Sequence, residues 1–410
     1  MDLVEIMSHL SIPRPNHSEA LGETATFIRT TLTDWGVPFV VQQFPLRPYM
    51  QLILGITVLV LAILLLVLIL KKKPVAALVV ALAIPLLLIV EFELFIPVVT
   101  GIVRETGENI VVSYTVPNPA RELIFAAHYD SKTDFWDHIQ RARIYRFIPL
   151  AFVLGLLLAL FTFFTKRYAA LKKKAVTAVT LVLAGTLVVY WGLVFLGFGG
   201  YIFIPSDRQS FGAVDNGTSV AALMALAKDI QDGKLSLGNS NVTIIFTAGE
   251  EVTLQGAHWY VRERFGSGEK PALPTSLVNL ELFAQNGPMV YWKKDGIFLK
   301  YFDADPDLVA RLSATWRNVS GTEMEPRDKI TDDAQRFMAA GIPAITIGNA
   351  GIPGLGEGGF HSTKDNFSRV NMENLTLMIR ALELYIETYI TKYCRAHRFW
   401  SDYGISPRLS

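Results

Sequence analysis

Five short clusters of histidine and acidic residues contain the side chains best suited to chemistry. Imidazole and carboxylate groups bind metal ions and exchange protons, so clusters that meet in space could form a metal centre or an acid–base site. Each cluster comes directly after a predicted strand or at the start of a predicted helix. The clusters are His128-Tyr129-Asp130, Asp215, Glu250-Glu251, Glu281 and His361.

Each cluster on its own also has an ordinary structural explanation. Asp215 opens a predicted helix and could be its N-cap. A Glu-Glu pair is usual in a solvated loop, and a single histidine after a strand is usually a hydrogen-bonded structural residue. Residues two apart share a face in extended backbone, so Asp130 can accept the second ring N–H of His128 and fix its tautomer, as is typical of metal-binding histidines. The functional interpretation depends on all five clusters occurring together, in order, at strand ends of one sheet.

The elements that would position these clusters alternate between strands and helices. Such alternation predicts an α/β fold with a mostly parallel sheet and helices on both faces. In this architecture, ligands collect at the carboxyl ends of the strands. The predicted strands are 37–41, 109–116, 122–127, 241–247, 277–282 and 342–347, and the predicted helices are 19–35, 214–230, 256–264 and 372–393.

The composition excludes several classes of protein. The chain has 410 residues, of which 51% are hydrophobic and 18% are charged, and its net charge is +1. A neutral balance offers no electrostatic surface for nucleic acid, so no nucleic-acid partner is expected. The only cysteine, Cys394, cannot form an intramolecular disulfide or a cysteine-based metal cluster. The mean hydropathy of +0.34 is too high for an ordinary soluble enzyme, so part of the chain should lie in lipid.

Two pairs of long apolar segments account for this hydropathy. Residues 49–70 contain no charge, and 22 residues of helix span about 33 Å, which is enough to cross a hydrocarbon core of about 30 Å. The next run is interrupted only near its end, by Glu91 and Glu93. Buried core helices of this length without charges are rare. We therefore predict two transmembrane hairpins, 49–100 and 147–198, which divide the rest into 1–48, 101–146 and 199–410.

The hairpin tips predict the orientation of this integral, multi-pass membrane protein. Both tips are basic: residues 71–73 are lysines, and 166–174 hold five Lys or Arg residues. Positive loops stay in the cytoplasm, so the remaining residues are expected on the extracytoplasmic side. Arg141, Arg143 and Arg146 flank the third span and argue for the opposite orientation.

The five clusters, read as motifs, resemble those of a known enzyme family. Their order is similar to that of the co-catalytic zinc exopeptidases of the bacterial leucyl aminopeptidase and aminopeptidase Y type, and the similarity extends over essentially all residues outside the hairpins. Residues 333–337, 341–344 and Pro13-Arg14-Pro15 agree further with that family. The motifs are His128–Ser131, Gly212–Asn216, Gly249–Glu251, Asn279–Glu281 and His361–Asp365.

The resemblance implies a zinc-dependent aminopeptidase-type enzyme with two zinc ions per chain. Asp215 would bridge the ions, His128 and Glu281 would complete one site, and Glu251 and His361 would complete the other. Glu250 would be the general base, and Asp130 would belong to the same catalytic centre. Two ions about 3.5–4 Å apart can acidify a shared water and polarise a scissile carbonyl. Glu281 departs from the family, which commonly has Asp there.

Two alternatives remain open at this stage. Glutaminyl cyclases resemble the same family, share the string His128–Lys132, and work with one zinc ion. A non-catalytic receptor on a peptidase fold is the other alternative, although all five ligand types and Glu250 are retained.

The second hairpin lies between two presumed ligands, His128 and Asp215, so it should leave the domain near the active site. We therefore expect a cleft close to the lipid bilayer and a peptide substrate that is hydrophobic or membrane-derived. The alternative is that the hairpins only anchor the catalytic domain.

Overall fold

A computed structural model of the protein describes residues 2–136, 138–167, 174–266, 271–297, 299–351 and 359–402. Within these residues, nine strands form one sheet in the order β1-β2-β4-β3-β5-β9-β6-β7, and β8 pairs with β6. The strands are β1 (Phe39–Leu46), β2 (Glu105–Tyr114), β3 (Arg121–His128), β4 (Ser240–Thr247), β5 (Thr275–Leu280), β6 (Met289–Gly296), β7 (Tyr301–Asp303), β8 (Glu325–Ile330) and β9 (Ala344–Asn349).

The centre of the sheet is parallel, and its flanks are mixed. β4, β3, β5 and β9 run parallel, whereas β1 with β2, β2 with β4, and β6 with β9 are antiparallel. The predicted α/β class is confirmed, with antiparallel flanks where a mostly parallel sheet was expected. In the register of the central strands, His128 pairs with Thr247 and Ala126 with Asn279. The carboxyl ends of β3, β4 and β5 therefore meet at one edge.

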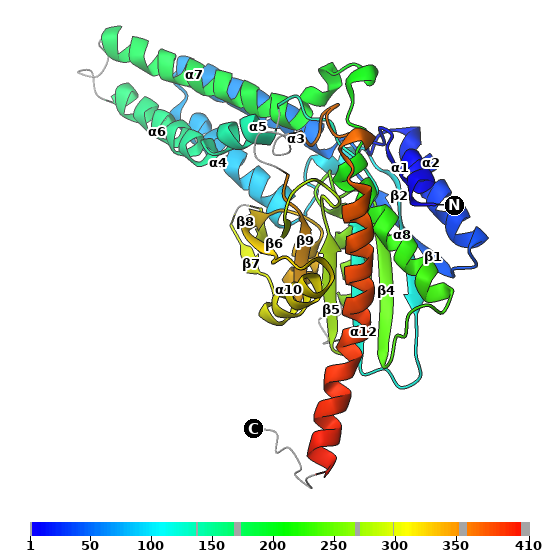
Figure 1. The fold of residues 1–410 in the computed structure, drawn as a ribbon. Coiled ribbons are helices and arrows are strands. Elements are labelled where there is room, and N and C mark those ends of the chain that lie inside the picture. Colours follow the sequence, from blue (N-terminus) through cyan, green and yellow to red (C-terminus); the bar gives the residue numbers. More distant parts are fainter. Residues whose placement is uncertain are drawn as a thin grey trace.

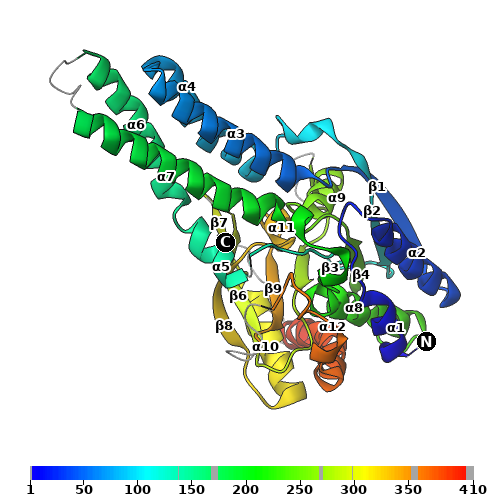
Figure 2. The ribbon, with the colours of Figure 1, turned by 90° about the horizontal axis from the view of Figure 1, so that it is seen from above.

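Helices cover both faces of the sheet (Figures 1 and 2). On β3, Leu123 and Phe125 pack into the core beneath α8 and α12, whereas Ile124 and Ala126 pack against α9 and α11. This alternation is why β3 reads as a continuous apolar run. The helices of the domain are α1 (Leu3–Leu10), α2 (Glu19–Asp34), α8 (Thr218–Gln231), α9 (Gln255–Phe265), α10 (Pro306–Ser320), α11 (Ala334–Ala339) and α12 (Met372–Asp402).

Four helices in the described residues are long and apolar enough to cross a membrane. They extend from one end of the molecule, opposite the end of α12 (Figure 1). α3 packs on α7 and α4 on α6, and together they form an apolar cluster separate from the two cores of the sheet domain. Of the predicted second basic tip, residues 168–173 lie outside the described residues. The bounds are α3 (Met50–Leu70), α4 (Pro74–Leu88), α6 (Ile148–Arg167) and α7 (Lys174–Gly199). The second candidate span, Pro74–Glu93, comprises α4 and the turn that follows it.

The first hairpin is inserted at the turn between two paired strands. Leu46 at the end of β1 pairs with Glu105 at the start of β2, so the chain leaves and re-enters the sheet at adjacent points. An insertion at such a turn leaves the strand register intact. The second hairpin follows β3 and is preceded by the short helix α5 (His138–Tyr145).

The buried acid at the base of the first hairpin is fully paired. α4 continues into a π-helical turn, Ile89–Glu93, in which Glu91 is inaccessible to solvent. The Glu91 carboxylate accepts hydrogen bonds from the Val99 N–H at 2.6 Å and the Thr100 hydroxyl at 2.6 Å, and it lies 3.5 Å from the Arg47 guanidinium. These contacts fasten the end of the hairpin to the end of β1.

Candidate metal centre

The five predicted ligands meet at the carboxyl edge of the sheet. Asp215 belongs to two groups of potential metal ligands, and within each group the ligand atoms all lie within 4.8 Å of one another. One group is His128, Asp215 and Glu281, and the other is Asp215, Glu251 and His361.

Asp215 directs one carboxylate oxygen toward each histidine. Its Oδ1 lies 3.3 Å from Nε2 of His128, and its Oδ2 lies 3.0 Å from Nε2 of His361. Asp215 does not cap α8, because it lies in the irregular turn Ala213–Gly217 that precedes the helix. One carboxylate thus faces both groups at once, which is the geometry required of a bridging ligand.

In the first group, Glu281 reaches the site in spite of its extra methylene. Its Oε1 lies 3.4 Å from His128 Nε2, and its Oε2 accepts a hydrogen bond from the Asn216 amide at 3.0 Å. His128 Nδ1 lies 3.1 Å from the main-chain carbonyl of Asp130 and 3.5 Å from its carboxylate. These contacts hold the imidazole ring with Nε2 facing the cluster. The atom nearest to Nδ1 is the main-chain carbonyl oxygen of Asp130, whereas the sequence predicted the side-chain carboxylate of Asp130 as its partner.

In the second group, His361 is oriented by an acid that the sequence did not reveal. His361 Nε2 lies 2.8 Å from Glu251 Oε1, and its Nδ1 lies 2.7 Å from the carboxylate of Asp134. Arg141 and Lys132 both form ion pairs with Asp134. A carboxylate behind a histidine ligand fixes the ring and raises its basicity. Asp134 belongs to none of the motifs, so only its place in the fold identifies it.

Asp130 holds the turn that carries the two glutamates. Its carboxylate is buried and accepts the main-chain N–H of Glu250 at 3.2 Å, that of Glu251 at 3.0 Å, and the side-chain amide of Asn16 at 2.6 Å. The turn begins at Gly249, whose φ is +74°, and a Cβ there would lie 2.8 Å from Leu46. Glycine adopts this conformation without strain, and the two adjacent glutamates diverge after it, Glu250 toward His128 and Glu251 toward His361.

The turn that carries Asp215 is held in a similar way. Asp365 accepts the N–H of Val214 at 2.7 Å and the N–H of Asp215 at 3.2 Å. Behind it, the buried Arg14 guanidinium donates to the carbonyl of Gly212 at 2.8 Å. Both residues lie within the resembling motifs, although their function in the turn was not predicted.

Glu250 lies beside the two groups and belongs to neither of them. Its nearest carboxylate oxygen is 4.0 Å from His128 Nε2. It lines a cavity of about 710 Å³, together with Asp215, Glu251, Glu281 and His361. This volume is within the range of small-ligand sites, and Glu250 is free to act on a bound molecule.

The donor atoms fit divalent cations. Tetrahedral zinc with bonds of about 2.0–2.1 Å places its ligand atoms about 3.3 Å apart, close to the separations of 3.3 and 3.4 Å in the first group. Burial raises the pKa of Glu281 to about 8 and raises that of Glu250 well above its usual value. Burial disfavours the ionised form of these carboxylates, and a bound cation would stabilise that form. The raised pKa values are therefore consistent with a cation site.

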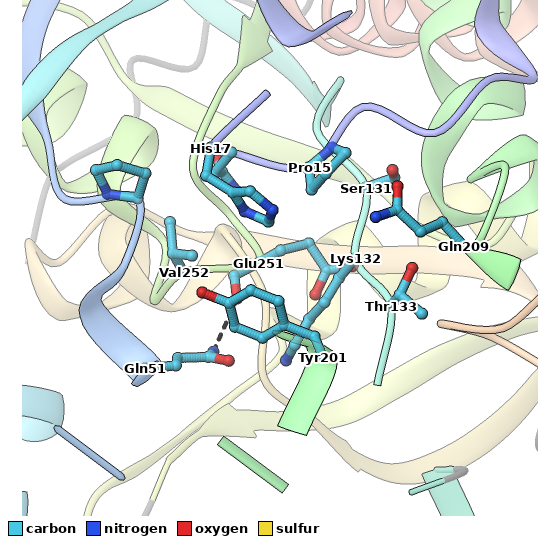
Figure 3. Close-up of a pocket in the computed structure, with 12 residues that line it drawn as sticks. Pro15, His17, Gln51, Ser131, Lys132, Thr133, Tyr201, Gln209, Glu251 and Val252 are labelled. Carbon is cyan, nitrogen blue, oxygen red and sulfur yellow. Dashed lines mark hydrogen bonds between the residues drawn. The ribbon is translucent and has the colours of Figure 1, made fainter. Parts of the chain in front are cut away.

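The apolar hairpins contribute to the walls of this cavity. Gln51 of α3, Phe92 of the π-helical turn, and Tyr145 of α5 all line it. Figure 3 shows Gln51 hydrogen-bonded to Glu251, and both residues also line a smaller pocket together with His17 and Tyr201. The hairpins are therefore in direct contact with the candidate site.

Comparison with known proteins finds a family resemblance over part of the chain. Residues 197–386 match peptidase family M28. No curated protein matches the chain in sequence. The resemblance inferred from the motifs is thereby confirmed, and the chain is an enzyme of the metallopeptidase class.

Solved structures share the fold at low sequence identity. A leucine aminopeptidase precursor from Bacteroides thetaiotaomicron has a TM-score of 0.52 and 14% identity over 95% of this chain and 97% of that chain. A Zn-dependent exopeptidase from Parabacteroides distasonis has a TM-score of 0.51 and 15% identity, covering 94% and 98%. A glutaminyl cyclase from Fimbriiglobus ruber has a TM-score of 0.54 and 13% identity, covering 94% and 95%. The predicted zinc exopeptidase-like fold is confirmed.

Proposed function

We propose that this protein is a membrane-embedded, zinc-dependent exopeptidase of the aminopeptidase type that holds two zinc ions per chain. The observation that carries the proposal is the placement of one Asp215 oxygen against each histidine. Two further ligands, Glu281 and Glu251, complete the two groups, each with carboxylate and imidazole donors suited to zinc. His128 and Glu281 would hold one ion, Glu251 and His361 would hold the other, and Asp215 would be shared between them.

Glu250 is the general base in this proposal. When bound, a pair of zinc ions supplies Lewis acidity that lowers the pKa of a water and polarises the scissile carbonyl. Glu250 accepts a proton from the attacking water and delivers it to the nitrogen of the leaving amine. Asp130 keeps Glu250 in place through the main chain, and Asp134 keeps His361 in place through its ring. Both are positioning residues.

Glutaminyl cyclisation is the second candidate, because enzymes with that activity share this fold and this protein has the string His128–Lys132. A peptidase releases a free amino acid with uptake of water, whereas a cyclase converts an amino-terminal glutamine to a lactam and releases ammonia. The test is mass spectrometry of products from zinc-loaded protein in detergent, with peptides that begin with leucine or with glutamine. Released amino acids support the peptidase. Formation of cyclised peptide without any hydrolysis would refute the peptidase proposal and support the glutaminyl cyclase.

We further propose that the site faces the bilayer from the extracytoplasmic side and takes hydrophobic or membrane-derived peptides. The cavity walls formed by Phe92 and Tyr145 support this placement, since both lie beside the membrane helices. Arg141 is paired with Asp134, so it is weaker evidence against the basic-tip orientation than its sequence position suggests. An impermeant thiol reagent applied to intact cells that carry Lys234→Cys and Cys394→Ala tests the side. Labelling without lysis supports this orientation, and labelling only after lysis refutes it.

A further inference from the structure

The charged residues that line the active cavity are unevenly distributed. In the described part of the chain, the carboxylates that line it are the four of the metal centre, Asp215, Glu250, Glu251 and Glu281. The remaining charged residues of the lining are all basic: Lys132, Arg141, Arg327 and Lys329. The walls beyond the metal centre therefore carry positive charge that no wall carboxylate balances.

The four basic residues fall into two pairs with different surroundings. Lys132 and Arg141 share the carboxylate of Asp134, which also contacts His361, so this pair serves the metal centre. Arg327 and Lys329 lie on β8, where their polar partners are Glu325 and the hydroxyl of Tyr301. Because the groups paired with Asp134 are Lys132, Arg141 and His361, the pair on β8 is the better candidate for contact with substrate.

The backbone of β8 directs both cations to the cavity. Arg327 and Lys329 are two residues apart in a strand, so their side chains share a face. Arg327 pairs in register with Trp292 of β6, which also lines the cavity. Asp328, between them, faces the other side of the strand pair, where it lies 3.9 Å from Lys293. The same two strands thus have one face toward the cavity and one face away from it.

The partners of these two cations leave them able to bind an anion. The ammonium of Lys329 lies 3.2 Å from the hydroxyl of Tyr301 and 4.8 Å from the centre of its ring, so a neutral group holds it at the cavity. Arg327 has Glu325 at 3.6 Å, with side-chain exposures of 37% and 52%. Ion pairs this exposed and this long are weak, and a substrate can displace them.

The charge balance strengthens this view and rests on the proposed two-zinc function. Two divalent cations would neutralise the four carboxylates of the metal centre. The field in the cavity would then come from its basic walls, and a concave site with low-dielectric walls focuses such a field on the ligand.

We propose that Arg327 and Lys329 are specificity-determining residues that bind a free carboxylate on the peptide substrate, so that among peptides of equal hydrophobicity the enzyme prefers those that carry one. The carboxylate can be an acidic side chain or the terminal carboxylate of a short peptide, since both present the same planar anion. Arg327 provides a fork of N–H donors that matches a carboxylate, and Lys329 adds a point charge.

The test compares three peptides that have the same residue before the scissile bond. The residue after that bond is Glu-amide in the first, Gln with a free carboxyl group in the second, and Gln-amide in the third. We expect kcat/KM of the intact protein for either charged peptide to exceed that for Gln-amide about tenfold or more, mainly through KM. The double variant Arg327→Gln/Lys329→Gln should lose this preference, so that its kcat/KM values for the three peptides become equal. Lys293→Gln, on the opposite face of the strands, should retain it. The two charged peptides distinguish a side-chain from a terminal carboxylate.

Two measurements keep the proposal falsifiable if the double variant folds poorly. The preference of the intact protein for charged peptides should shrink as salt rises, because screening weakens contacts at an exposed wall. Calorimetry with Glu250→Gln should show tighter binding of the charged peptides independently of turnover. Equal cleavage of all three peptides would overturn the proposed carboxylate specificity and leave the peptidase proposal standing. A preference for charged peptides that survives in a folded double variant would also overturn the carboxylate specificity. Absence of any hydrolysis would instead refute the peptidase.

Discussion

The side-chain amide of Gln51 donates a hydrogen bond of 2.8 Å to the main-chain carbonyl of Glu251 (Figure 3). Gln51 is in the first turn of α3, and Glu251 is one of the candidate metal ligands. Four residues earlier, the N–H of Arg47 donates to the side chain of Gln255 at 2.9 Å. The start of the first hairpin is thus bonded to the turn that carries Glu250 and Glu251, at Glu251 itself and at Gln255, where α9 begins. This turn connects the apolar helices to the site.

Gln51→Leu should lower kcat without preventing membrane insertion. The substitution removes one hydrogen bond to the Glu251 backbone and places an apolar side chain in the span. Loss of one such bond predicts a decrease of about five- to tenfold. Thr57→Val is the matched control, since Thr57 bonds only within α3 to the carbonyl of Ile53. Steady-state kinetics of both variants in lipid nanodiscs would check this, and equal kcat values for both would mean that the hairpin is only an anchor.

Glu250→Gln should abolish turnover and leave metal binding intact. The amide cannot accept the proton of the attacking water, and a lost general base costs about 10²- to 10⁴-fold in rate. Glu250 belongs to neither ligand group, so metal content should equal that of the unchanged protein. Peptide hydrolysis and elemental analysis on one preparation would measure both quantities. Normal turnover in this variant would remove the proposed mechanism.

Asp134→Asn should weaken metal binding at the His361 group. The variant keeps the side-chain shape and removes the charge behind the His361 ring, and loss of such a partner costs about 10- to 100-fold in metal affinity. Competition with a chelator should show one weakened ion and one unchanged ion, because Asp134 contacts His361 but not His128. Asp303→Asn, at a side chain that is 81% exposed, serves as the control. Equal affinities in the two variants would assign Asp134 a purely structural function.

The strands that carry the ligands could be predicted because strands buried on both faces have continuous apolar sequences. β3 and β4 are apolar runs that end where polar clusters begin, and the parallel register then places His128 level with Thr247. The predicted strand 122–127 corresponds to Arg121–His128, and the predicted strand 241–247 corresponds to Ser240–Thr247. Convergence of the ligands followed from topology, without knowledge of any side-chain contact.

The residues that were missed act through contacts between segments distant in sequence. Asp134 lies 227 residues from His361, and Gln51 lies 200 residues from Glu251, so no local pattern links either pair. The antiparallel pairing of β1 and β2 was hidden for a related reason. The hairpin 49–100 separates the two strands in sequence, and the short turn that usually marks a strand pair is absent.

Metal binding should release protons, and the apparent affinity should therefore increase with pH. In the metal-free protein, burial raises the pKa of Glu281 to about 8. Burial disfavours charged His128, but the nearby Glu281 and Glu250 carboxylates outweigh it and raise its pKa well above the usual value. At neutral pH these groups hold protons that coordination must displace. Titration calorimetry in two buffers of different ionisation enthalpy would count the protons, and a count of zero would contradict the assigned ligands.

The central claim is that Asp215 joins two metal sites, and metal stoichiometry tests it most directly. Protein purified in detergent, reconstituted with zinc and freed of loosely bound metal, should contain two zinc ions per chain by elemental analysis. Asp215→Asn should lose both, because its oxygens face both histidines at 3.3 and 3.0 Å. One ion in the unchanged protein, or a full complement in Asp215→Asn, would contradict a bridged two-metal centre.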